Sequence, residues 1–110
     1  MRALLLAVSV VAALPVAASA QANPQADRNA YTYAVRCFAA AGFARQRGVQ
    51  TDNGKRAYDM ALRLGSQRGY TPSEADGDIR TRTSTELVTM RRDAAYLDRA
   101  FSDCRRIGLL

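Results

Sequence analysis

The spacing of apolar residues between positions 85 and 107 restricts the possible folds of this chain more than any other feature. These residues follow one another at steps of three and four, at Leu87, Met90, Ala94, Leu97, Phe101 and Cys104. Such spacing places all of them on one side of an α-helix. We therefore predict a long C-terminal helix that buries this side against the rest of the protein.

Residues 1–20 predict a secretory signal peptide. Arg2 gives a positive start, residues 3–14 carry no charge, and the Ala-Ser-Ala sequence at 18–20 supplies the small residues that a cleavage site needs. The apolar core is shorter than the roughly 20 residues of a transmembrane span, although an uncleaved anchor is the alternative. We expect a bacterial protein that is exported, periplasmic or secreted, with no transmembrane segment in the mature chain.

The two cysteines of the chain are Cys37 and Cys104. Each lies on the apolar side of a predicted helix, and an exported chain with two cysteines is best explained by one disulfide bond. Two free thiols or an intermolecular bond are the alternatives. The bond would join the first predicted helix to the last.

Residues 21–110 predict a single all-α domain, a small bundle of three to four helices closed by the disulfide. The expected helices cover about 24–47, 52–68, 72–78 and 84–107. The three longer helices each end near a glycine followed by an apolar residue, the pattern of a left-handed glycine cap, at Gly48-Val49, Gly69-Tyr70 and Gly108-Leu109. Short connections favour an up-down-up arrangement in which the first and last helices lie side by side and roughly parallel.

The region between Gly77 and Thr83 contains poor helix formers, and we expect a break or kink there. A proline after a capping box, in Thr71-Pro72-Ser73-Glu74, marks the start of the helix before it. One continuous helix from Pro72 is the alternative.

The composition argues against catalysis. The chain has no histidine, which removes the commonest general base and the commonest transition-metal ligand. Glu74, Asp76 and Asp78 lie close together, but their spacing lacks the twelve-residue loop of an EF-hand. We expect no enzymatic activity, no cofactor and no metal site.

Arginine supplies almost all of the positive charge, which gives the chain a formal net charge of +6. Arg92, Arg99 and Arg106 recur every seven residues opposite the apolar side of the C-terminal helix, and Arg91 and Arg105 flank them. We predict that these five form a binding face, although a solvated outer face would show the same pattern. The leading hypothesis is a protein partner in the cell envelope. An anionic envelope surface or glycolipid is the alternative, and nucleic acid is not expected outside the cytoplasm.

Overall fold

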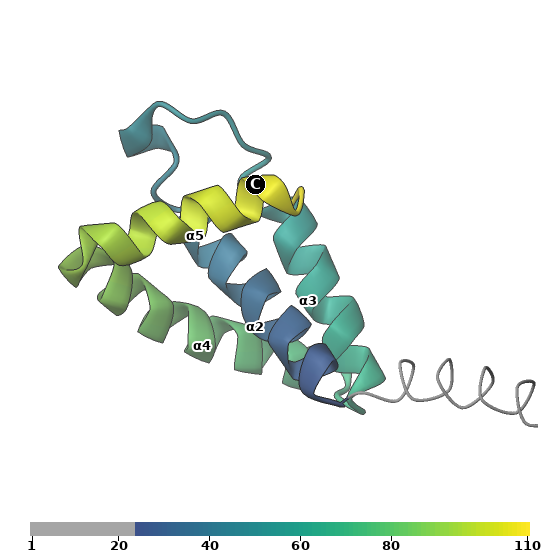
Figure 1. The fold of residues 1–110 in the computed structure, drawn as a ribbon. Helices are drawn as coiled ribbons and strands as arrows, with labels where there is room; N and C mark the ends of the chain where they lie inside the picture. The colour runs from purple at the N-terminus through teal and green to yellow at the C-terminus, as the bar shows by residue number, and fades with distance from the viewer. Residues whose placement is uncertain (1–23) are drawn as a thin grey trace, which may run out of the picture.

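A computed structural model describes residues 24–110, so the predicted signal peptide at 1–20 lies outside the described residues. The described part of the chain is all-helical, as predicted, with four α-helices and one short 3-10 helix (Figure 1). The elements are α2 (Pro24–Ala41), η1 (Arg45–Arg47), α3 (Lys55–Gln67), α4 (Pro72–Arg92) and α5 (Ala94–Arg106).

Helices α2, α3 and α4 alternate in direction, because the end of each lies near the start of the next. Gly54, just before α3, lies so close to Phe38 of α2 that a Cβ there would be 2.8 Å from the ring. Gly65, near the end of α3, faces Ala75 at the start of α4 and Tyr31 in the first half of α2. The three helices therefore run up, down and up.

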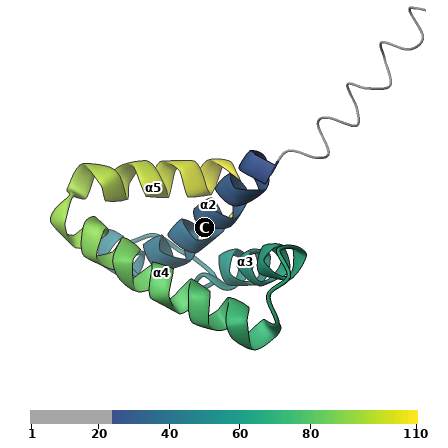
Figure 2. The ribbon, with the colours of Figure 1, turned by 90° about the horizontal axis from the view of Figure 1, so that it is seen from below.

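Helix α5 crosses α2 in the opposite direction (Figures 1 and 2). The disulfide joins the last turn of α5 to Cys37, whereas residues nearer its start, such as Leu97, share a cluster with Ala44, beyond the end of α2. The predicted parallel packing of the first and last helices is therefore wrong. The physical reason is a turn at Asp93, which reverses the chain after α4.

The predicted break between Gly77 and Thr83 is also wrong, because α4 is continuous from Pro72 to Arg92. The predicted capping box starts it: the Thr71 hydroxyl accepts from the Glu74 N–H at 3.2 Å, and the Glu74 carboxylate accepts from the Thr71 N–H at 2.8 Å. Along the helix, hydroxyl groups donate to the carbonyl oxygen four residues earlier, at Thr81, Ser84, Thr85 and Thr89. These bonds satisfy four of the hydroxyl groups within the helix, so the threonine-rich stretch does not interrupt it, although the Thr83 hydroxyl has no partner in the described part of the chain.

The helix expected over 84–107 is instead the end of α4 followed by α5. Asp93 between them has an extended backbone, and its side chain accepts a hydrogen bond from the Tyr96 N–H at 3.1 Å. The same residue therefore terminates α4 and caps the N-terminus of α5. The apolar pattern continues through this break: Met90, Leu97, Phe101 and Cys104 are buried, although Ala94 is exposed.

The first and second helices are shorter than predicted. Helix α2 ends at Ala41 rather than at 47, and a turn at 42–44 followed by η1 occupies the difference. Helix α3 begins at Lys55 rather than at 52, because the Asp52 carboxylate caps the preceding turn by accepting from the N–H groups of Gly54 and Arg56. The predicted left-handed glycines are found, with φ values of 66°, 93° and 78° at Gly48, Gly69 and Gly108. Gly69 and Gly108 follow the ends of α3 and α5 as predicted, whereas Gly48 caps η1 and not the first long helix.

The disulfide between Cys37 and Cys104 is confirmed, with Cα atoms 5.6 Å apart and both side chains fully buried. It lies in the core between α2 and α5. The disulfide packs against Ala57 of α3, while the largest fully buried side chains, Tyr31, Ile79 and Met90, belong to two neighbouring core clusters. Within the described residues, no helix combines the length and the apolar character needed to cross a membrane.

Candidate functional site

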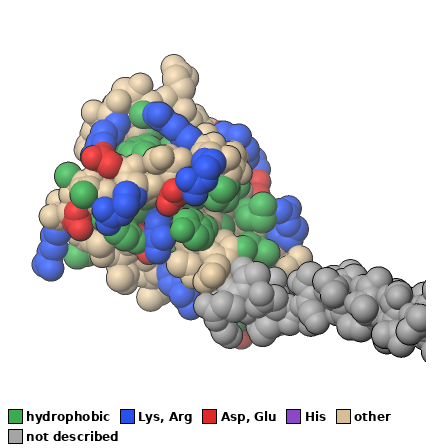
Figure 3. All heavy atoms as spheres, viewed as in Figure 1, with side chains coloured by type: hydrophobic (Ala, Val, Ile, Leu, Met, Phe, Trp, Pro, Cys, Tyr) green, Lys and Arg blue, Asp and Glu red, His purple; other side chains and the backbone are tan. Residues whose placement is uncertain are grey.

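The five arginines of the predicted binding face are all exposed, but they do not form one straight stripe. Arg91 and Arg92 lie in the last turn of α4, whereas Arg99, Arg105 and Arg106 lie on α5. The turn at Asp93 interrupts the seven-residue repeat. Figure 3 shows Lys and Arg side chains spread over this face of the molecule, with acidic side chains among them and hydrophobic side chains between.

Most of these arginines have no carboxylate partner. Arg106 pairs with Asp103 at 2.9 Å. Arg99 lies 6.0 Å from the centre of the Tyr96 ring. Among the described side chains, none of the other four arginines (Arg91, Arg92, Arg99 and Arg105) forms an ion pair.

Two of the predicted arginines line a surface hollow of about 620 Å³ between η1 and the last turns of α5. We call it the arginine hollow. Its lining consists of Arg47, Val49, Asp98, Phe101, Ser102, Arg105 and Arg106. Arg47 forms an ion pair with Asp98, and its guanidinium lies 5.6 Å from the centre of the Phe101 ring. The hollow therefore joins three guanidinium groups to an apolar floor.

Sequence reasoning missed Arg47. It was expected within the first helix, far from the C-terminal arginines, and only the folded chain brings η1 beside α5. The available local signal was the glycine cap at Gly48, where a basic residue precedes the turn.

A second hollow of about 810 Å³ lies on the other side of the connection between α2 and α3. We call it the loop groove. Phe38, Val49 and Leu87 supply apolar surface, and Val49 also lines the arginine hollow. The Thr83 side chain lines the groove, but its hydroxyl oxygen is covered and has no hydrogen-bond partner in the described part of the protein. None of the residues that line this groove is acidic.

Several other polar side chains are bonded to one another inside the fold. The Tyr31 hydroxyl donates to the Asp78 carboxylate at 2.6 Å, and Arg82 pairs with the same carboxylate at 2.8 Å. Burial, and then this hydrogen bond, raise the pKa of Tyr31 well above its ordinary value. Burial opposes ionisation of Asp78, but the hydrogen bonds from Tyr31 and Arg82 outweigh it and lower the pKa of the carboxyl. This network stabilises the contact between α2 and α4.

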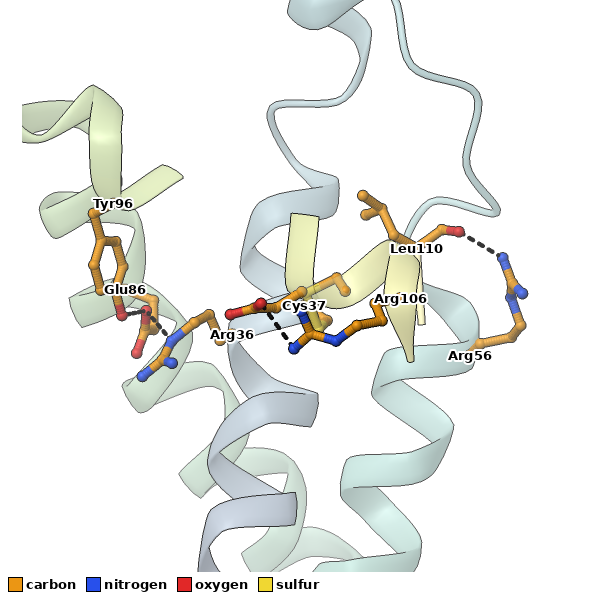
Figure 4. The surroundings of a disulfide bond; sticks show 9 residues. Arg36, Cys37, Arg56, Glu86, Tyr96, Arg106 and Leu110 are labelled. Carbon is orange, nitrogen blue, oxygen red and sulfur yellow. Dashed lines mark hydrogen bonds and ion pairs between the residues drawn. A yellow bond between two sulfur atoms is a disulfide. The ribbon is translucent and has the colours of Figure 1, made fainter. Parts of the chain in front are cut away.

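A similar network lies at the other end of the same interface (Figure 4). Tyr96 donates to Glu86 at 2.6 Å, and the Arg36 guanidinium lies 3.4 Å from the same oxygen. Figure 4 also shows Arg56 of α3 reaching the C-terminal end of the chain, where it donates to the Leu110 carbonyl oxygen at 2.9 Å. These contacts hold the helices together.

Asp76 and Asp78, two of the three neighbouring acidic residues noted in the sequence, also form contacts between helices. Tyr58 and Arg80 both bond to Asp76, and Asp78 belongs to the network with Tyr31. In the described part of the chain, no group of three or more acidic or cysteine side chains is placed to hold a metal ion.

Comparisons with protein-family models, with curated proteins and with solved structures found no match for this chain. The chemistry of the two hollows and of the exposed arginines is thus the basis for assigning a function.

Proposed function

We propose that this chain is a non-catalytic bacterial protein, exported to the periplasm or secreted, that acts by binding a protein partner of the cell envelope. The contact surface is the arginine surface, which we define as the five predicted residues: Arg91, Arg92, Arg99, Arg105 and Arg106. Export is inferred from the signal-peptide pattern at 1–20 and from the disulfide, since disulfides persist in oxidising compartments.

The observation that carries this proposal is the uneven pairing of arginines. Outside the arginine surface, carboxylates pair with most of the described arginines, namely Arg36, Arg47, Arg56, Arg80 and Arg82, whereas Arg45, Arg63 and Arg68 form no ion pair among the described side chains. Among the described side chains, four of the five arginines of the arginine surface have no such partner. Exposed guanidinium groups without partners leave a positive potential that attracts acidic surfaces. Arginine is also enriched at protein interfaces.

An anionic envelope surface or glycolipid is the second candidate, because the same unpaired arginines would attract it. A helix that binds in the membrane interface usually adds an apolar face to its positive charge. In the described residues, the large exposed apolar side chains are Val88 on α4 and Ile107 after α5, on different elements. This arrangement favours a protein partner over a lipid surface.

The test is in-cell crosslinking of the tagged protein in its native envelope, followed by mass spectrometry. We compare the wild type with a variant that carries Arg92→Gln and Arg99→Gln. The control carries Lys55→Gln and Arg63→Gln on α3, which removes the same charge from exposed positions elsewhere. We expect one dominant protein partner that is lost in the first variant and retained in the control.

Equal capture by all three proteins would contradict the arginine surface as the contact. If no protein is captured, and the purified protein binds vesicles of phosphatidylglycerol in a salt-sensitive way, the second candidate replaces the first.

A further inference from the structure

We propose that the arginine hollow is a binding site for an acidic polypeptide segment, with a carboxylate at Arg105 and an apolar side chain against Val49. This inference rests on the proposed function, because it assigns a place and a ligand chemistry to the contact with the partner.

The hollow is built from two distant parts of the chain. Arg47 comes from η1, and Arg105 and Arg106 come from the last turn of α5. Arg47 is held by its ion pair with Asp98 and by the ring of Phe101. Arg106 is held by Asp103 at 2.9 Å. Two of the three guanidinium groups are therefore positioned before any ligand binds, which lowers the entropy lost on binding.

The third guanidinium is available for a ligand. Arg105 is exposed and has no ion pair among the described side chains, although it lines the same hollow. A guanidinium presents parallel N–H donors that match the two oxygens of a carboxylate. The lining contains three arginines and one acidic residue, Asp98, so it remains positive after the internal ion pair is counted.

The apolar and neutral polar residues of the lining restrict which other groups the ligand can have beside its carboxylates. Val49 is half-buried and offers apolar surface next to the charged groups, while the ring of Phe101 beneath Arg47 is buried; this suits a small apolar side chain beside a carboxylate. The exposed Ser102 hydroxyl forms no side-chain hydrogen bond in the described part of the chain, so it is free to bond with a neutral peptide group. The Asp98 carboxylate would repel a dense array of phosphates, whereas a peptide with separated carboxylates can avoid it.

The hollow also has the size of a recognition site. Its volume of about 620 Å³ lies within the range of ligand pockets, roughly 300–1,000 Å³. The hollow is wide and open to solvent, so a peptide segment that projects from a partner can lie across it.

The experiment titrates the oxidised protein with a blocked peptide, Ala-Glu-Leu-Glu-Ala, at low salt, and follows the arginine side-chain N–H signals by NMR. We expect saturable shifts at Arg47 and Arg105. The neutral peptide Ala-Gln-Leu-Gln-Ala should bind at least several-fold more weakly, because it cannot form the charged contacts.

Two pairs of variants test the location. Ser102→Asp places a carboxylate one turn before Arg105 and Arg106, where it occupies them and repels the ligand. We expect the dissociation constant of the acidic peptide to rise about tenfold. The control Ser84→Asp makes the same charge change at an exposed position of α4 outside the hollow and should have little effect.

Arg105→Gln removes only the unpaired guanidinium, so we expect the dissociation constant to rise about threefold. The control Arg63→Gln removes an exposed arginine of α3 and should leave binding unchanged.

Several outcomes would overturn the proposal. The proposal is wrong if the peptide binds the two aspartate variants equally, or if the NMR shifts are confined to other arginines. It is also wrong if no shift appears at millimolar peptide. If inorganic phosphate or phosphatidylglycerol vesicles bind the hollow as tightly as the peptide does, the hollow is an unselective anion site and the proposal is wrong. If the peptide does not bind while the envelope partner is still captured, only the assignment of the binding site is wrong. If the peptide binds but no partner is captured, the proposed function is wrong and the site remains.

Discussion

Reduction of the Cys37–Cys104 bond should remove a large part of the stability of this protein. The bond joins residues 67 apart in the sequence. On the chain-entropy model, closing a loop of that length in the unfolded state stabilises the folded state by about 4 kcal/mol. The total free energy of unfolding of a domain is usually about 5–15 kcal/mol. A small bundle such as this one would therefore keep only part of its stability after reduction.

The assay is urea and thermal unfolding of the oxidised and reduced protein, followed by circular dichroism. In a domain of this size, a loss of about 4 kcal/mol lowers the Tm by roughly 20 °C. A double variant with Cys37→Ala and Cys104→Ala provides the control, because its stability should not respond to the reducing agent. Thiol titration of the unfolded oxidised protein should find no free thiol.

The reasoning is refuted if reduction lowers the free energy of unfolding by less than about 1 kcal/mol. It is also refuted if the oxidised protein has two free thiols, because the two helices would then be held together without the bond.

Three further predictions concern the contact between α2 and α4. Tyr31→Phe should lower the free energy of unfolding by about 1–3 kcal/mol in denaturation experiments, because it leaves Asp78 without its buried donor, whereas Tyr33→Phe should have a smaller effect. Thr83→Val should raise the free energy of unfolding by about 1 kcal/mol, since it removes a covered hydroxyl without a partner, and Thr89→Val, at an exposed hydroxyl that is already bonded, should not raise it. The pKa of Asp78 is lower in the folded state, so its contribution should be complete above the ordinary carboxyl pKa of about 4 and decline as the pH falls through the lower folded value. Acid unfolding curves of Asp78→Asn should show a weaker pH dependence in that range, and an unchanged dependence would contradict this assignment.

The parts of the fold that were predicted from sequence depend on local chemistry. The glycine caps at Gly48, Gly69 and Gly108 follow from backbone conformations that glycine adopts without strain. The capping box at Thr71 depends on residues within a single turn. The pairing of Cys37 with Cys104 followed because the chain offers one possible intramolecular bond.

The position of the helix break depends instead on tertiary packing. Propensity favoured a break between Gly77 and Thr83, but Ile79 is buried there against the other helices, and the hydroxyl groups of Thr81, Ser84 and Thr85 bond to earlier carbonyls of the same helix. Asp93 became the break because turning there lets Met90 on α4 and Leu97 on α5 pack into the same cluster with α2. The spacing of apolar residues does not reveal this turn, because it continues unchanged through Asp93.

The candidate site, like the fold, was predicted only where its residues lie close together in the sequence. Arg105 and Arg106 were predicted from their spacing on a helix, but Arg47 contributes to the hollow through a contact between residues far apart in the sequence. No local pattern in the sequence could place η1 beside α5. The structure therefore changed the predicted site from a stripe along one helix to an exposed surface with a hollow at one end.

The disulfide and the arginine hollow depend on the same packing of α5 against α2. Cys104 directly precedes Arg105, and the bond to Cys37 fixes this last turn of α5 to the helix from which the chain continues into η1. Loss of the bond would remove the covalent link at the last turn of α5, so Arg105 and Arg106 would be held opposite Arg47 only by the packing of Leu97, Ala100 and Phe101. The hollow would be held most firmly where the disulfide persists, which is in an oxidising compartment. Under the proposed export and binding, an acidic ligand would thus be bound most tightly after export, so the same two cysteines that stabilise the fold would also favour the proposed binding in an oxidising compartment.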